Sequence, residues 1–417
     1  MNNEIQLHHK LITLPTGKRA SDFVAERHDI VFLFDCAKSN PNGDPDTGNM
    51  PRVQPDSLKG LVTDVCQKRK ARNFFSLYNP DGTPRPDGTT AFGYQIFIRE
   101  NAVLQESMES PEIEALARKI FAEELGQKPE AWDAKGKKKG GKGKKSEKTE
   151  PEQPDEAEKE EISPADDFKK QSYRAALLRT FFDLRAFGGV ISTEGPLKGS
   201  FYGQVRGPIQ FTFAESLDKV LQLDSTITRC AVASVKEKDK QQKEEDGDSS
   251  GNRTMGRKHG IDYGLYRCHI HFSPAFAAKT GFTYGDLDNF LFALTRCLGD
   301  YNVDGSSARP GGMRVIGLVD FQHTSPLGNG PAHKLFNLVC VSGIKNDEGK
   351  FKSSGSEFPQ GLNDYHGSAP DGAIFTDTNS YGIVTNCTDK KPAKKDGNEP
   401  ATNITARRLV WEIPPMK

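Results

Sequence analysis

The residues best equipped to hold a negatively charged ligand form one run at positions 252–259, NRTMGRKH. Arginine and lysine grip phosphate groups, amides and hydroxyls position sugars, and a methionine wedges between bases at modest unstacking cost. The run follows a very polar stretch and directly precedes a strand-like segment, as the returning arm of a hairpin does. The candidate binding residues are Asn252, Arg253, Thr254, Met255, Arg257, Lys258 and His259. The alternative interpretation is a solvated charge cluster.

A second candidate is the segment GQVRGP at 203–208, which places Gln204 and Arg206 between glycines. Glycine lets a ligand backbone come close, and a guanidinium can fork onto a phosphate. The alternative is a β-bulge that carries an exposed arginine.

The loop at 39–49, SNPNGDPDTGN, is built from residues that favour tight turns. Its alternating oxygens superficially resemble a calcium loop, but the glutamate ligand at the far end is missing. We therefore favour a rigid turn in which backbone amides, Asn40 and Asn42 meet a phosphate or a sugar.

A cationic helix is predicted directly after this loop. Asp56 and Ser57 can cap it, and apolar residues recur at helical spacing through Cys66. Its basic side chains lie largely off the apolar stripe; those assigned to binding are Lys59, Lys68, Arg69 and Arg72. The competing explanation is the preference of a helix C-terminus for cations.

The residue pattern contains no recognisable catalytic motif, P-loop or dinucleotide fingerprint. The seven cysteines are scattered and never form C-x-x-C, so neither a disulfide framework nor a zinc site is indicated. His269 and His271 lie on one strand face without an obvious carboxylate partner and are interpreted as core or sheet-face residues. We expect no catalytic residues, no metal and no cofactor.

Hydrophobic periodicity predicts the elements that position these residues. Strands are expected at 29–36, 94–99, 263–272, 314–323 and 335–342, and helices at 111–125, 173–186 and 284–298, the last capped near Thr283. Strands interrupted by a pair of helices indicate an α+β protein with a ferredoxin-like β-α-β-β-α-β core, the core that RRM domains share.

Two strongly polar stretches, 133–167 and 236–251, hold too few apolar residues to offset the entropy of ordering, and we expect them to be disordered. The predicted organisation is an N-terminal extension (1–28), a first part of the core (29–132), a charged linker (133–167), a second part of the core (168–350) with a thumb-like hairpin at about 225–262, and a C-terminal extension (351–417).

Formal net charge is zero, which by itself argues against a nucleic-acid ligand. The distribution matters more, because acidic residues concentrate at 147–167 while 68–72 and 253–259 are locally basic. No apolar run approaches the length needed to span a bilayer, and we expect a cytoplasmic protein with no membrane contact.

Several long strings in order resemble the backbone subunit of the subtype I-C CRISPR Cascade complex, a member of the repeat-associated RNA-binding superfamily. They are FLFDCAKSNPNGDPDTGNMPRV, LVTDVCQKRKARNF, GQVRGPIQFTFAESLD, ITRCAV, NRTMGRKH followed by YGLYR, and SPLGNGPAHKLF, and they cover most of residues 28–340. The resemblance implies a modified RRM palm, a thumb hairpin and head-to-tail polymerisation of copies along one guide RNA.

By the same resemblance, the candidate residues above contact the guide RNA backbone, and the last string adds His333 and Lys334. Target DNA would be read by pairing with the guide, and other Cascade subunits would be partners. The alternatives are a metal-dependent ribonuclease of the same superfamily that uses Asp35 or Asp44, and a stand-alone RRM-type regulator. The two polar stretches and the tail after Phe351 depart from the family, so nothing transfers to them.

Overall fold

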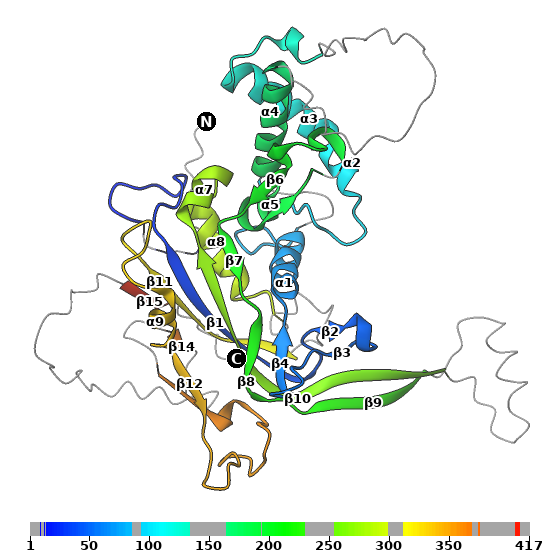
Figure 1. Ribbon diagram of the computed structural model, residues 1–417, viewed down its shortest axis with the longest axis vertical. Coiled ribbons are helices and arrows are strands. Elements are labelled where there is room, and N and C mark those ends of the chain that lie inside the picture. Colours follow the sequence, from blue (N-terminus) through cyan, green and yellow to red (C-terminus); the bar gives the residue numbers. More distant parts are fainter. Residues whose placement is uncertain are drawn as a thin grey trace, which may run out of the picture. The chain divides into compact units, whose positions relative to one another are not determined.

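A computed structural model describes residues 9, 12, 14–85, 93–133, 164–192, 194–229, 254–298, 312–368, 374–375 and 405–408 (Figure 1). At a few of these, Thr254 and Met255 among them, only the backbone is described. The chain divides into two compact units, one from residues 1–88 with 208–417 and one from residues 89–207. Packing thus groups the chain differently from the predicted ranges 29–132 and 168–350.

A large, mostly antiparallel sheet forms the centre of the first unit. Its central strands are β1 (His28–Ser39), β10 (Thr254–Phe272) and β11 (Met313–Gln322). The outer strands are β4 (Lys59–Val62), β7 (Ile209–Phe211), β8 (Ala214–Lys219), β14 (Ile374–Phe375) and β15 (Thr405–Arg408). The order is β14-β11-β1-β10-β8-β4, with β7 also on β10 and β15 also on β11. An α+β fold with an antiparallel sheet is therefore confirmed.

Helices cover one face of this sheet. They are α1 (Asp64–Leu77), α7 (Pro274–Thr280) and α8 (Tyr284–Leu294). Phe32 and Phe34 of β1 lie against Gln67 of α1 and Leu294 of α8 around a small buried void. The predicted cap is confirmed, because the Thr283 hydroxyl accepts from the Asp286 N–H and the Asp286 carboxylate accepts from the Thr283 N–H.

The opposite face is covered as well. The covering elements are α9 (Ala332–Phe336), β12 (Cys340–Gly343), η7 (Leu362–Asp364) and β13 (Tyr365–Ser368). Val31 and Leu33 of β1 are buried in a cluster with Leu335, Phe336 and Tyr365. The two faces of β1 therefore belong to two different apolar layers.

A long two-stranded arm extends from the sheet (Figure 1). It consists of β9 (Gln222–Arg229) and the first part of β10, paired from Thr254 opposite Arg229 to Ile261 opposite Gln222. A short turn region near its base contains β2 (Gly43–Asp44), η1 (Pro45–Thr47) and β3 (Met50–Pro51). The hairpin arm predicted around 225–262 is present over the described residues.

The second unit has its own apolar core. Its elements are α2 (Leu104–Met108), α3 (Pro111–Lys119), η2 (Ile120–Glu124), η3 (Pro129–Ala131), α4 (Pro164–Thr180), α5 (Phe182–Phe187), β5 (Gly188–Val190), η4 (Gly195–Leu197), η5 (Phe201–Gly203) and β6 (Gln204–Arg206). Trp132 is buried between Phe121 and Tyr173, with ring centroids 5.3 Å from each. The helix predicted at 111–125 corresponds to α3 and η2, whereas the residues predicted as one helix at 173–186 divide between α4 and α5, with a break at Phe181.

The helix predicted from Ser57 begins instead at Asp64, and residues 59–62 form β4. Leu58 has a φ of 56°, which interrupts a helix, and β4 pairs with β8 far along the chain. Thr63 is the actual N-cap, and the buried face carries Gln67 and Phe74 instead of the predicted stripe.

Two predicted strands are wrong. Residues 94–99 form no strand, since the Asp183 carboxylate accepts the backbone N–H groups of Phe97 and Ile98. Residues 335–342 divide between α9, which begins after Pro331, and β12. Most of 133–167 and all of 236–251 lie outside the described residues, although 164–167 belong to α4 and not to a linker.

Candidate nucleic-acid interface

The arm displays its polar side chains to solvent. Arg257 and Lys258 are exposed on β10, whereas the His259 side chain is only 11% exposed. Asp224 on β9 lies between two of them, with its carboxylate 3.5 Å from Arg257 Nη1 and 3.3 Å from His259 Nδ1. Within the described residues the Lys258 side chain forms neither a hydrogen bond nor an ion pair. Asn252 and Arg253 lie outside the described residues, and only the backbone of Thr254 and Met255 is placed, in β10.

The asparagines of the turn region form hydrogen bonds within the chain. Asn42 Oδ1 accepts hydrogen bonds from the backbone N–H of Thr63 at 2.9 Å and from its hydroxyl at 3.0 Å. Asn40 Nδ2 donates to the Asn49 carbonyl at 2.8 Å. These bonds fasten the loop to the start of α1 and use the acceptor oxygen of Asn42, whereas its Nδ2 donates to the Gly43 carbonyl at 3.5 Å.

Asp44 has a structural role in the same loop. Its carboxylate accepts from the Asp46 N–H at the start of η1 and pairs with Arg52 Nη2 at 3.2 Å. Among the described residues no group of His, Cys, Asp or Glu could hold a metal ion. The calcium interpretation gains no support from this loop.

The turn region, β4 and the base of the arm contact one another. Gln222 Nε2 of β9 donates to the Pro51 carbonyl at 2.9 Å, and the Val220 N–H donates to the Leu58 carbonyl at 3.0 Å. At Gly260 a Cβ would lie 3.3 Å from the Ser39 carbonyl, so the backbones approach closely there. One contiguous region of the first unit therefore holds the loop and the arm (Figure 1).

Two predicted cations of this region are ion-paired. Lys59 lies on β4, not on a helix, with Nζ 2.9 Å from Glu215 Oε1 of β8. Lys68 pairs with Asp64 one helical turn earlier, also at 2.9 Å. Arg69 is exposed on α1 and Arg72 is half-buried. The basic run between them also contains a residue that faces the core, since Lys70 is 2% exposed.

Gln204 and Arg206 belong to the second unit, on β6. Both side chains are exposed, and β5 pairs with β6 in a regular register, without the bulge of the alternative interpretation. Of the two glycines that flank Gln204 and Arg206, Gly203 has no room for a Cβ because of Ser192, and Gly207 has none because of the backbone of the residues before β5. Both glycines thus let segments of the chain itself approach closely.

His333 and Lys334 lie on α9 and are exposed. α9 covers the face of β1 opposite to the one that α1 covers. The structure therefore does not bring these two residues together with Lys68, Arg69 and Arg72 on one face of the sheet.

Asp29 anchors a buried polar network at the start of β1. His323 Nε2 lies 2.9 Å from its carboxylate, His271 Nδ1 lies 3.0 Å away, and Arg27 adds an ion pair at 2.9 Å. Burial alone would raise the pKa of Asp29, but both histidine hydrogen bonds and the charge of Arg27 hold it well below its ordinary value. His271 does have a carboxylate partner, contrary to the sequence-based expectation.

Asp35 is fully buried on the same strand. Arg314 forms an ion pair with it, with Nε 3.0 Å from Oδ1, and the Tyr263 hydroxyl donates to it at 3.0 Å. Burial raises the pKa of this carboxyl, an effect that both hydrogen bonds oppose. Asp35 is thereby occupied by structural partners.

His269 is a sheet-face residue, as predicted. Its ring stacks on Phe336 of α9 with centroids 4.0 Å apart, and Nε2 accepts from Arg267 Nε at 3.0 Å. Burial, together with the nearby charges of Arg267 and His271, lowers its pKa to about 4. His269 is therefore neutral at physiological pH.

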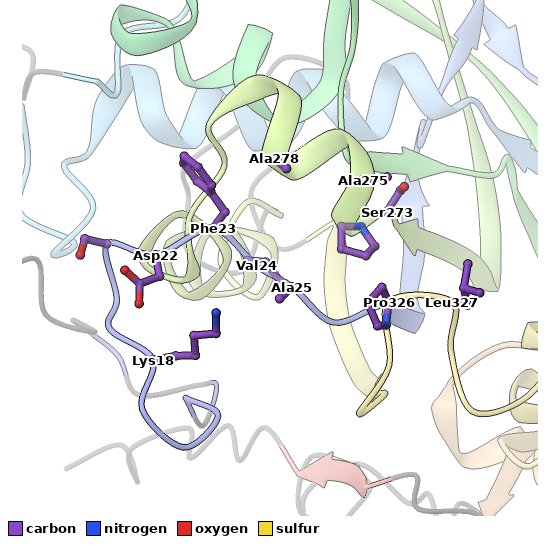
Figure 2. Close-up of a pocket in the computed structure, with 12 residues that line it drawn as sticks. Lys18, Asp22, Phe23, Val24, Ala25, Ser273, Ala275, Ala278, Pro326 and Leu327 are labelled. Carbon is purple, nitrogen blue, oxygen red and sulfur yellow. The ribbon is translucent and has the colours of Figure 1, made fainter.

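An open groove lies elsewhere on the first unit, between residues 18–25, α7 and the loop after β11 (Figure 2). Phe23, Pro274 and Leu327 give it an apolar lining, and Lys18 and Asp22 are its charged residues. With one charge of each sign, this groove does not offer a cationic path.

The carboxylates beside the cations, Asp224 and Glu215, were not identified from the sequence. Asp224 lies 33 residues from Arg257, and Glu215 lies 156 residues from Lys59. No local spacing signals such pairs, because they depend on strand register.

No helix among the described residues is long and apolar enough to cross a membrane.

Comparison with solved structures returns two chains whose titles name RNA-guided assemblies. One, titled "CRISPR RNA-guided surveillance complex, pre-nicking", is 15% identical with a TM-score of 0.34 and covers 71% of this chain and 77% of that one. Another, titled "CRISPR RNA-guided surveillance complex", is 12% identical with a TM-score of 0.29 and covers 71% and 68%.

Sequence comparison is more decisive. A curated relative, CRISPR-associated protein Cas7 of Haloferax volcanii, is 43% identical over 47 residues, which are 11% of this chain and only 14% of that protein. The family model for CRISPR-associated protein Cas7 matches residues 26–366, a span that includes the central strands, the turn region and the arm. The chain belongs to the Cas7 family of CRISPR-associated proteins.

Proposed function

We propose that this chain is a guide-RNA-binding backbone subunit of a Cascade-type CRISPR complex, of subtype I-C. The observation that carries the proposal is the family match over residues 26–366, which spans both the arm and the turn region at its base. These elements display Arg257 and Lys258 to solvent. Cations on a projecting two-stranded arm suit a nucleic-acid backbone, which offers regularly spaced charge and demands no sequence readout.

The core is proposed to be a modified ferredoxin-like fold. In chain order the segments are β1, α1, β7 with β8, β10, α8 and β11, and the sheet order β11-β1-β10-β8 corresponds to 4-1-3-2. α1 and α8 lie on one face, as in that fold. The face that a stand-alone RRM leaves open for stacking is here covered by α9 and β12, which disfavours the regulator alternative.

Recognition in this proposal is of the guide backbone, not of its bases. The guide would be presented for pairing with target DNA, and several copies of this chain would line it head to tail beside other Cascade subunits. Arg206 on β6 of the second unit and Lys334 on α9 are exposed cations, and each is a separate candidate contact for the guide.

A non-catalytic role fits the placement of the carboxylates considered for cleavage. Asp35 is buried and held by Arg314 and Tyr263, and Asp44 holds its own loop and Arg52. General acid–base work and metal binding both need a carboxylate that reaches its ligand. No specific observation favours the ribonuclease alternative.

The test is co-expression of the chain with a CRISPR array, followed by purification and sequencing of the bound RNA. The proposal predicts RNA of uniform length with a repeating nuclease-protected footprint. Cleavage of labelled RNA in the presence of Mg²⁺ that disappears in Asp35→Ala and Asp44→Ala, with circular dichroism confirming that each variant is folded, would instead support the ribonuclease. A purified chain that retains no RNA above a tag-only control would contradict the proposal.

A further inference from the structure

Five cations near the arm and turn region form ion pairs with carboxylates of the same chain. The pairs are Lys38 with Asp262, Arg52 with Asp44, Lys59 with Glu215, Lys68 with Asp64, and Arg257 with Asp224. This arrangement explains how a chain with a formal net charge of zero can still present many basic side chains in one region. Each of these cations is therefore already paired with a carboxylate of the chain when no ligand is bound.

Two of these carboxylates are free to move away from their cations. The Asp224 side chain is 46% exposed and Glu215 is 44% exposed, whereas Asp262 is 13% exposed. Asp44 caps η1 and Asp64 lies in the first turn of α1, so both also stabilise local structure. Among the described residues, the Asp224 and Glu215 carboxylates cap no helix.

Exposed ion pairs are weak and exchangeable. A pair at the surface contributes about 0–1 kcal/mol, because water screens the charges and two long side chains lose freedom. A phosphate oxygen makes the same charge-assisted hydrogen bonds to lysine or arginine as a carboxylate oxygen does. RNA can therefore replace the carboxylate, but the displaced carboxylate stays within a Debye length and repels the incoming phosphate.

We propose that Asp224 and Glu215 are specificity-determining residues that act as internal competitors of RNA for Arg257 and Lys59. This inference rests on the proposed function. Each isolated RNA contact is weakened by the competing carboxylate, so short or unrelated RNA is held poorly. Stable binding then requires many contacts at once, as a long guide bound by adjacent copies provides.

The competition also changes how binding responds to salt. When RNA displaces a carboxylate, that carboxylate recovers part of its own counterion atmosphere, so fewer ions are released per contact. For single strands each fully effective phosphate contact changes the slope of log K against log salt by about −0.7. Removing a competing carboxylate should therefore make the slope steeper as well as raise affinity.

The experiment measures binding of a labelled single-stranded RNA of unrelated sequence to full-length protein, at several salt concentrations. The variants are Asp224→Asn, Glu215→Gln and the double variant. The matched control is Glu348→Gln, which also removes one negative charge from an exposed pair, with Lys350 at 3.2 Å, away from the arm. Each single variant should bind roughly threefold more tightly than the wild type, the size expected for losing one surface competitor.

The double variant should show a slope steeper by about 1, while Glu348→Gln should match the wild type. Equal gains in Glu348→Gln would show that net charge alone matters and would overturn the proposal. Unchanged or weaker binding in Asp224→Asn and Glu215→Gln, with circular dichroism confirming the fold, would overturn it too. If neither the wild type nor any variant binds RNA, the proposed function fails together with it.

Discussion

The buried ion pairs of the central sheet and the exposed ion pairs near the arm are made from the same residue types but differ in what they can do. Asp29 and Asp35 are 0% exposed and each accepts from two or more fixed donors. Asp224 and Glu215 are nearly half exposed, and each pairs with one cation, Arg257 and Lys59 respectively. Residue type therefore does not identify a binding site in this chain.

Burial decides how easily the partner of a charged side chain can be replaced. A buried partner cannot be replaced by water, so its removal leaves an uncompensated charge. An exposed partner can be replaced by water, salt or a phosphate at little cost. The candidate ribonuclease carboxylate, Asp35, belongs to the first class, and the candidate RNA contacts belong to the second.

The largest expected effect follows from breaking a buried pair. Asp35→Ala leaves Arg314 and the Tyr263 hydroxyl without their acceptor and should lower the free energy of unfolding by about 3 kcal/mol or more, measured by chemical denaturation. Asp224→Ala is the exposed counterpart and should cost no more than about 0.5 kcal/mol. Similar losses in the two variants would erase the distinction between the two regions.

The second effect is a pH dependence at Asp29. Its depressed pKa means that the ionised carboxylate stabilises the folded state, fully so above its unfolded pKa of about 3.9 and progressively less as pH falls through the folded value. Asp29→Asn should therefore cost roughly 2 kcal/mol at pH 7, and the difference from the wild type should shrink below about pH 4. The difference in the free energy of unfolding between Asp29→Asn and the wild type is measured by denaturant unfolding at several pH values from about 2.5 to 7. A difference between the two free energies of unfolding that stays constant down to the lowest pH would contradict the stabilising role of the ionised Asp29 carboxylate.

A smaller change in stability is expected at Asn42, a residue that the sequence analysis predicts to contact RNA. Asn42→Ala removes the acceptor for the Thr63 N–H and hydroxyl and should lower the free energy of unfolding by about 1 kcal/mol. Its RNA affinity should stay within twofold of the wild type, roughly the scatter of a surface change. A large loss of affinity with unchanged stability would restore Asn42 as a direct RNA contact.

The smallest effect compares neighbouring cations on the arm. Lys258→Ala should reduce the magnitude of the salt slope by about 0.7. Arg257→Ala should reduce it less, because Asp224 already holds that guanidinium. Lys350→Ala, beside Glu348 and away from the arm, provides the control. If Arg257→Ala changes the salt slope more than Lys258→Ala does, the ion pair with Asp224 does not weaken the contact of Arg257 with RNA.

Much of the sheet could be predicted because its signals are local. The apolar run at 29–36, the alternation at 263–272 and the Thr283 cap each depend on a few neighbouring residues, and the structure has β1, β10 and α8 there. The boundary between β4 and α1 could not be predicted in this way. It depends on the left-handed Leu58 and on pairing with β8, which lies more than a hundred residues away.

The candidate interface was predictable only in part. Local charge indicated Arg257 and Lys258, which are exposed as a binding role requires. The same reasoning placed Lys59 on a helix and could not recognise that α9, with His333 and Lys334, covers the opposite face from α1. Side chains brought together by strand register, such as Asp224 and Arg257, leave no trace in local spacing.

Exposed cations of this chain are proposed to hold an RNA backbone without reading its bases. The most direct measurement is the affinity of the full-length protein for single-stranded RNAs of different sequence across a salt series. About four phosphates neutralised per copy predict a slope of log K against log salt near −3, the same for every sequence. An affinity that does not change with salt, or one that depends on the sequence of the RNA, would contradict the account.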